Sequence, residues 1–151
     1  MTVWVPATSE VSETLIDFLR AERNSRHDHA FVHPKAVERC CRTGKAWRAV
    51  TDSGEVVGVA LGTKRTLWNL IVRSDHRGQG LGTSFLHALQ PDFIRVKKST
   101  DHRLPDPLPF YERNGYWTLG EVHSTTIRNG KRYHGRVLLV SRVQLSLDGV
   151  A

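Results

Sequence analysis

The residues best suited to chemistry are the glycines that follow a short apolar segment in the middle of the chain. A strand, a turn with alternating glycines and the start of a helix aim free backbone N–H groups at a common point, with the positive end of the helix dipole behind them. Glycine also lets the backbone approach an anion without a Cβ in the way. We therefore predict a phosphate-binding site here, to which Arg77 could add positive charge. The residues concerned are Leu70, Ile71 and Val72, then Arg77, Gly78, Gln79, Gly80, Leu81, Gly82 and Thr83.

The glycine pattern alone leaves two interpretations open. It lacks the Lys-Ser/Thr ending of a nucleoside-triphosphate P-loop, and the strand before it belongs to a meander and does not open a Rossmann unit. The alternative is a helix N-terminus whose glycines serve only close packing.

Two motifs together resemble the GNAT acetyltransferases. The first is Arg77-x-x-Gly80-x-Gly82 after Leu70-Ile71-Val72, which matches the family signature Q/R-x-x-G-x-G/A. The second, about thirty residues further on, is Phe110-Tyr111-Glu112-Arg113-Asn114-Gly115-Tyr116, which is similar to F-Y-x-x-x-G-F. The resemblance is specific from Leu67 to Tyr116 and extends weakly over the rest of the chain.

The resemblance implies an acetyl-coenzyme A site. Leu70, Ile71 and Val72 would form its strand, the backbone of Leu70 and Val72 bonding the pantetheine arm, and the amides from Gly78 through Thr83 would cradle the pyrophosphate. Tyr111 matches the tyrosine that protonates the departing thiolate. The alternative is that Tyr111 packs on the sheet with its hydroxyl bonded to backbone.

The sequence departs from the family pattern in three places. Trp68-Asn69 stands where many relatives carry a glutamate that activates the amine, and Ser74 replaces a common proline. A Lys-rich and then Pro-rich stretch stands where an asparagine often contacts the coenzyme. An exposed amine can lose its proton through ordered water. The available titrating groups are Asp75, His76, His27, Asp28, His29 and His33. The histidine spacing fits no standard zinc pattern, so we expect no metal.

Hydrophobic periodicity and turn residues predict the elements that must position these motifs. The expected strands are 3–5, 46–52, 55–62, 67–73, 93–97, 116–123 and 133–143. A turn at Ser53-Gly54 joins the second strand to the third, and a turn at Asn129-Gly130 joins the last two. Four helices are expected. The first opens at Ser9, the second spans 34–43, the third follows the glycine-rich turn and ends before Pro91, and the fourth covers 110–114. We predict an α+β (mixed α/β) fold, with a central, mostly antiparallel sheet of about six to seven strands and about four flanking helices. Residues 1–151 are expected to form a single GNAT-like acetyltransferase domain.

Composition limits the class of protein. The chain has 151 residues with a hydrophobic fraction of 39%, which excludes disorder as the main state and allows a core without disulfides. The neighbours Cys40 and Cys41 are expected to be reduced and buried. No apolar run approaches a membrane span, and the N-terminus lacks a signal-peptide pattern. We therefore expect a cytoplasmic protein with no membrane partner.

The charge indicates an anionic partner. Lys and Arg number 22 against 15 Asp and Glu, a net charge of +7. A coenzyme phosphate, a nucleic acid or an acidic protein would fit such a balance. A basic group near the last predicted hairpin could meet a polyanion or be a solvated face. It consists of Arg128, Lys131, Arg132 and Arg136.

Two functions follow. The first is an N-acetyltransferase that moves acetyl from acetyl-coenzyme A to a primary amine of a small molecule, peptide or protein, by direct attack in a ternary complex. The alternative is a nucleic-acid-associated module of the same fold that modifies or recruits to a nucleobase or a nucleic-acid-bound protein. The chain has no recognisable helix-turn-helix or aromatic RNA-binding motif, which counts against the alternative.

Overall fold

A computed structural model gives the fold of residues 1–25, 32–63, 65–99, 107–128 and 131–141. The chain divides into two compact units, Met1–Gln90 and Pro91–Ala151. The described residues form seven strands and four α-helices. Most strand pairs are antiparallel, so the predicted α+β class is confirmed.

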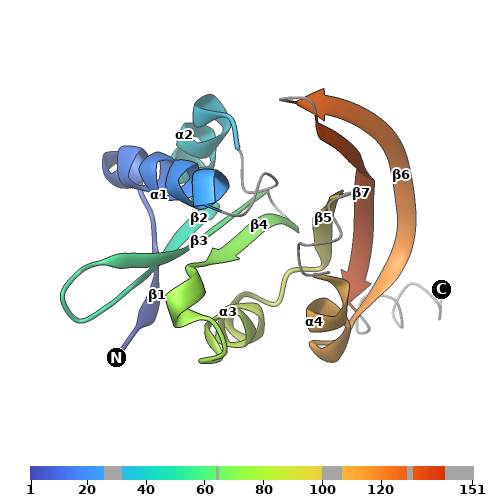
Figure 1. The fold of residues 1–151 in the computed structure, drawn as a ribbon. Helices are drawn as coiled ribbons and strands as arrows, with labels where there is room; N and C mark the ends of the chain where they lie inside the picture. The colour runs from blue at the N-terminus through green and yellow to red at the C-terminus, as the bar shows by residue number, and fades with distance from the viewer. Residues whose placement is uncertain (26–31, 64, 100–106, 129–130, 142–151) are drawn as a thin grey trace. The chain divides into compact units, whose positions relative to one another are not determined.

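The first unit is an antiparallel meander in which each strand pairs with the next along the chain (Figure 1). Its strands are β1 (Val3–Pro6), β2 (Ala46–Val50), β3 (Val56–Gly62) and β4 (Thr66–Val72). The connection between β2 and β3 is wider than the predicted Ser53-Gly54 turn. The Thr51 hydroxyl accepts a hydrogen bond from the Glu55 N–H at 3.1 Å. This bond closes the connection between the end of β2 and the start of β3.

Helices α1 (Ser12–Ser25) and α2 (Pro34–Arg42) lie together beside the first unit's sheet in Figure 1. Leu15, Leu19 and Val37 are buried in one cluster with residues of β3 and β4. The prediction that α1 opens at Ser9 was wrong by one turn. A 3₁₀ turn, η1 (Ser9–Val11), comes first, and its N-cap Thr8 is extended and makes no side-chain hydrogen bond to it.

Helix α3 (Leu81–Leu89) packs on strands β1 and β2 through its Phe85, which contacts one tryptophan of each strand. The ring of Phe85 lies 4.7 Å from that of Trp4 and 5.4 Å from that of Trp47, centroid to centroid. The Trp4 indole N–H also donates to the Leu81 carbonyl oxygen at 2.9 Å. These contacts fix the first turn of α3 against strands β1 and β2, so the glycine-rich turn leads into a firmly held helix.

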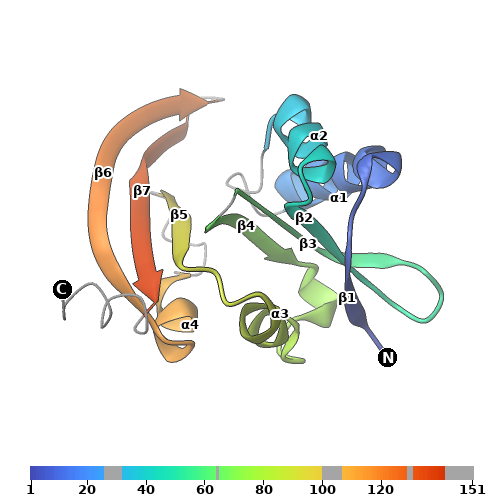
Figure 2. The same ribbon diagram turned by 180° about the vertical axis from the view of Figure 1, so that it is seen from behind.

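The second unit is a three-stranded antiparallel sheet with β7 (Lys131–Ser141) between β5 (Phe93–Ser99) and β6 (Tyr116–Arg128), as Figure 2 shows. Helix α4 (Leu108–Arg113) lies beside the start of β6. Strands β6 and β7 extend beyond their predicted ends at 123 and 133. The register continues to the pair Arg128 and Lys131, because cross-strand pairing stabilises residues that propensity alone leaves open. The predicted Asn129-Gly130 turn falls outside the described residues.

Candidate active site

The turn between β4 and α3 has the backbone that its glycines predict. A 3₁₀ turn, η3 (Ser74–His76), follows β4, and Arg77 then returns to an extended conformation. Gly78 has φ +76° and Gly80, the N-cap of α3, has φ +80°. Residues with a side chain rarely adopt these angles. The two glycines therefore decide the path of the turn.

Six consecutive backbone N–H groups at this turn are free to bind a ligand. No described residue accepts a hydrogen bond from the N–H groups of Gly78 through Thr83. A Cβ added at Gly78 or Gly80 would meet no atom within 4 Å, so the space beside the turn is open. Helix α3 adds the positive end of its dipole, since three of these groups belong to its first turn. The arrangement suits an anion with several acceptor oxygens, as a pyrophosphate has.

The preceding strand offers a second set of backbone groups. The Arg73 N–H donates to the Val57 carbonyl oxygen at 2.8 Å, so Arg73 faces β3 with its backbone. Backbone groups alternate in direction along an antiparallel strand, which turns those of Ile71 toward β3 and those of Leu70 and Val72 away from it. Ile71 is also buried in the core. Leu70 and Val72 are thus the predicted strand residues with backbone groups directed to the other edge of β4.

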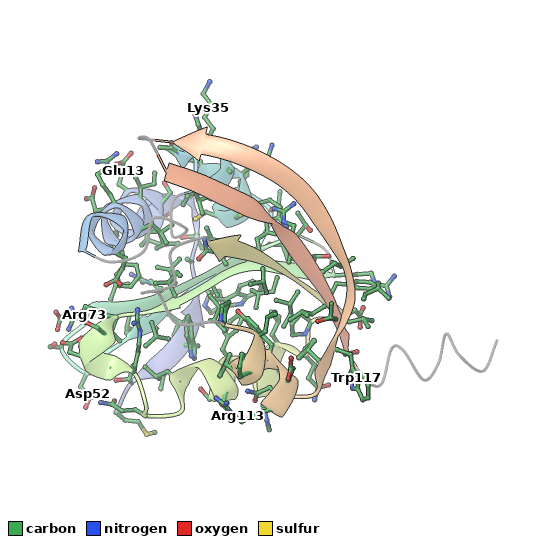
Figure 3. The ribbon with its side chains drawn as sticks, turned by 45° about the vertical axis from the view of Figure 1, so that its right-hand side comes forward. Glu13, Lys35, Asp52, Arg73, Arg113 and Trp117 are labelled. Atoms are coloured by element: carbon green, nitrogen blue, oxygen red, sulfur yellow. The ribbon has the colours of Figure 1, made fainter. Side chains whose placement is uncertain are left out.

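An ion-pair network braces the start of the turn. Arg73, whose side chain is labelled in Figure 3, donates from Nη1 to Glu55 at 2.6 Å and from Nε and Nη2 to the Asp75 carboxylate at 2.7 and 3.0 Å. Its hydrogen bonds are the main reason that the pKa of Asp75 lies well below the usual range. His76 Nδ1 lies 3.0 Å from the same carboxylate. Arg73 is thereby neutralised and is a brace for the turn.

Arg77 makes contacts on two sides. Its Nε donates to the Val72 carbonyl oxygen at 2.8 Å, and its Nη2 lies 3.8 Å from a carboxylate oxygen of Glu22. Glu22 belongs to α1, and its side chain is only 9% exposed. Sequence reasoning missed Glu22. The signal was present, because Glu22 continues the apolar helical spacing of Leu15 and Leu19, where a carboxylate is unexpected.

Tyr111 and Tyr116 differ in what their hydroxyl groups bind. The Tyr116 hydroxyl donates to the Pro91 carbonyl oxygen at 2.6 Å. Tyr111, on α4, is 7% exposed, and its hydroxyl has no hydrogen-bond partner among the described residues. Burial raises the pKa of both groups, that of Tyr116 to about 12. The Tyr111 phenol is therefore protonated at neutral pH and has a donor to offer.

Of the other predicted titrating groups, the structure describes His33 alone, and it lies on another element. His33 is the N-cap of α2, where its Nδ1 accepts a hydrogen bond from the Lys35 N–H at 3.1 Å. His27, Asp28 and His29 lie outside the described residues. Asn69, at the place of the family's glutamate, is 7% exposed, and its Oδ1 has no hydrogen-bond partner in the described part of the chain. A carboxamide cannot take up a proton as a carboxylate does.

The described residues form neither a metal site nor a membrane-spanning helix. No group of three or more of their His, Cys, Asp or Glu side chains is placed to hold a metal ion. None of the helices they form is both long and apolar enough to cross a bilayer.

Cys40 and Cys41 form no disulfide and are buried, as predicted. Burial raises the pKa of both thiols, which opposes a nucleophilic role.

Comparison with solved structures gives the fold. The apo form of YjaB from Escherichia coli is 21% identical, with a TM-score of 0.63, 94% of this chain covered and 98% of that one. NAA60 from Arabidopsis thaliana, with a bisubstrate analogue, is 15% identical with a TM-score of 0.67, covering 93% and 98%. The diaminobutyrate acetyltransferase EctA from Paenibacillus lautus, with L-2,4-diaminobutyric acid and coenzyme A, is 16% identical with a TM-score of 0.64, covering 93% and 94%.

Comparison with sequences gives the family. No curated protein matches the chain. The family model described as an acetyltransferase (GNAT) domain matches residues 42–118, which is just over half of the 151 residues and includes both motifs. The resemblance inferred from the motifs is confirmed, and this chain belongs to the GNAT acetyltransferase family.

Proposed function

We propose that this chain is an acetyl-coenzyme A-dependent N-acetyltransferase that acts on a primary amine by direct attack in a ternary complex. The observation that carries the proposal is the row of N–H groups from Gly78 through Thr83, which donate to no acceptor among the residues that the structure describes. The two positive-φ glycines that shape this row face open space. A polyphosphate coenzyme is the ligand that such a row fits best.

The residues that would hold the coenzyme divide by the part they bind. The amides of Gly78 through Thr83 would bind the pyrophosphate oxygens. The backbone groups of Leu70 and Val72 that turn away from β3 would bind the amides of the pantetheine arm. Ile71 would support this strand from the core, and Gln79 and Leu81 would contribute through their N–H groups. Arg77, which the resemblance also assigns to the coenzyme site, starts the turn that carries these amides.

The coenzyme, when bound, supplies an acetyl thioester, whose carbonyl carbon the amine attacks and whose thiolate leaves. The chain's own task is to place that carbonyl and to supply a proton to the sulfur. Tyr111 suits the second task because its hydroxyl is protonated and lacks a hydrogen-bond partner among the described residues. Because burial raises the pKa of the phenol and keeps it protonated, its hydroxyl would donate a hydrogen bond to the developing thiolate and pass its proton to the sulfur.

The amine must be neutral to attack, and no carboxylate occupies the family's usual position. Asn69 cannot serve as a base, so we propose that the acceptor ammonium loses one proton to water before it attacks and that its nitrogen loses a second proton to water as the amide forms. We also propose that the acceptor is an amine of a small molecule or a peptide, and that residues 1–151 act as one acetyltransferase domain. The alternative, a nucleic-acid-associated module, depends on Arg128, Lys131, Arg132 and Arg136, whose side chains lie outside the described residues. No observation favours it.

The proposal is tested by coenzyme binding in a pair of glycine variants. Acetyl-coenzyme A at a hundredfold excess over its Kd should stabilise the native protein by about 2.7 kcal/mol. Gly80→Glu places a side chain and a negative charge at the row of amides, so this stabilisation should disappear. Gly44→Glu is the matched control, because Gly44 has φ +75° and equally open surroundings but lies after α2.

Both variants should lose similar stability without ligand, because both force a side chain into a left-handed conformation. Only Gly80→Glu should lose the response to acetyl-coenzyme A. The proposed function is refuted if the parent protein shows no thermal shift and no calorimetric heat with saturating acetyl-coenzyme A.

A further inference from the structure

Arg77 connects the glycine-rich turn, the end of β4 and the distant helix α1, all within the first unit. It starts the glycine-rich turn, bonds the last carbonyl of β4 through Nε, and approaches the Glu22 carboxylate of α1 through Nη2. Glu22 and Arg77 are 55 positions apart in sequence. Folding alone brings them together.

The bond to Val72 fixes the strand end. Val72 directs its backbone away from β3, so its carbonyl oxygen lies on the edge of β4 opposite β3. The guanidinium occupies one acceptor position of that oxygen at 2.8 Å and leaves the Val72 N–H available. This bond closes the six residues from Val72 to Arg77 into a loop, and Gly78 is the first residue after it.

On its other side the guanidinium forms an ion pair with Glu22, at 3.8 Å between Nη2 and a carboxylate oxygen. A carboxylate that is only 9% exposed needs a cation and hydrogen bonds to stay charged. The Arg77 side chain is 36% exposed, so it spans from this buried carboxylate to solvent. A guanidinium with donors on two edges can hold the strand and the helix at once, as an ammonium cannot.

We propose that Arg77 is a positioning residue and that Glu22 is its anchor: the pair sets the direction of the amides of Gly78 through Thr83 and couples α1 to the coenzyme turn. The inference rests on the proposed function, since it assigns how that site is held in shape. It differs from a direct role, in which the guanidinium itself would bind a coenzyme phosphate.

The two roles predict opposite effects of one substitution. Glu22→Gln removes the anchor. If Arg77 positions the turn, coenzyme Kd should rise by about two- to 150-fold, which corresponds to the usual coupling between contacting groups. If Arg77 binds phosphate directly, Glu22→Gln removes a competing anion and Kd should fall.

The control is Glu13→Gln, the same chemical change on the same helix at a side chain that is exposed and labelled in Figure 3. This variant also loses one negative charge from α1, and its Kd for the coenzyme should stay within about twofold of the parent's value. In an Arg77→Gln background, Glu22→Gln should have no further effect on Kd. Additive effects of the two substitutions would overturn the pairing.

A measurement without coenzyme separates this inference from the proposed function. Backbone ¹⁵N relaxation should give order parameters of about 0.85 for Gly78, Gly80 and Gly82 in the parent and in Glu13→Gln. In Glu22→Gln these order parameters should fall toward about 0.6. Order parameters that are equal in the two variants would overturn the positioning role. If the parent binds no coenzyme, the proposed function fails while the relaxation result still decides whether Arg77 and Glu22 hold the turn.

Discussion

Replacing Tyr111 with Phe removes one hydroxyl whose role the structure narrows. The hydroxyl has no hydrogen-bond partner among the described residues, so its loss breaks no bond that holds the second unit together. The ring of Phe110 lies 5.1 Å from that of Tyr111, and the phenylalanine ring can keep this contact. We therefore expect Tyr111→Phe to fold with nearly the parent's stability.

The expected loss falls on turnover. A proton donor to a leaving group contributes about 10²- to 10⁴-fold to a rate. At about 1.36 kcal/mol for each tenfold change, this corresponds to about 2.7 to 5.5 kcal/mol of transition-state stabilisation. The coenzyme's ground-state thioester needs no proton, so its Kd should change little while kcat falls.

Tyr116→Phe is the matched control because it makes the same chemical change five residues away. It removes the hydrogen bond to the Pro91 carbonyl and leaves that oxygen unpaired, at a cost of about 1 kcal/mol. For a chain of this length, that cost lowers Tm by about 2 to 4 °C. The two variants should thus show opposite signatures: Tyr111→Phe loses kcat and keeps Tm, and Tyr116→Phe loses Tm and keeps kcat.

The assay is release of free thiol under single-turnover conditions, with Tm and coenzyme Kd measured on the same samples. Because burial raises the pKa of Tyr111, the donor stays protonated as pH rises past its ordinary value of 10.0. The rate should show no alkaline decline from this group below about pH 10. An unchanged single-turnover rate in Tyr111→Phe would refute the reasoning and make Tyr111 a packing residue.

Two further predictions concern stability. The depressed pKa of Asp75 stabilises the folded state above its ordinary value of 3.8, and this contribution is lost as pH falls. The stability gap between the parent and Asp75→Asn in urea unfolding should therefore narrow from about pH 4 to about pH 2, and a constant gap would contradict the Arg73 pairing. Gly58→Ala places a Cβ 2.9 Å from a ring carbon of Trp4 and 3.3 Å from the Ile71 carbonyl oxygen, which should cost about 1 to 3 kcal/mol. Gly120→Ala, which meets nothing within 4 Å, should cost clearly less by the same measurement, and equal costs would contradict the crowding at Trp4.

The sequence was sufficient for the features that local conformation controls. Alternating apolar residues predicted the strands, and the glycines predicted the turn before α3, because only glycine readily adopts a positive φ. Element ends were less accurate. Strand β6 extends to Arg128 because β7 pairs with it, and pairing partners cannot be identified from one strand alone.

The sequence also identified the family, since two motifs at the right separation fall within the matched residues 42–118. It did not distinguish the roles of neighbouring members of each motif. Tyr111 and Tyr116 are both buried tyrosines, yet within the described part of the chain only the Tyr116 hydroxyl is bonded to a carbonyl oxygen. Leu70 and Ile71 are adjacent, yet their backbone groups point to opposite edges of β4.

The contacts that hold the candidate site were decided by tertiary structure. Arg77 looks in sequence like a free cation beside a phosphate site, and the fold places its guanidinium between the Val72 carbonyl and the Glu22 carboxylate. A side chain's partner depends on which elements pack together, and residues 55 positions apart have no local signal for that contact. The turn's shape follows from glycine conformation, which is local, whereas what braces it follows from packing of α1 on the sheet, which is not.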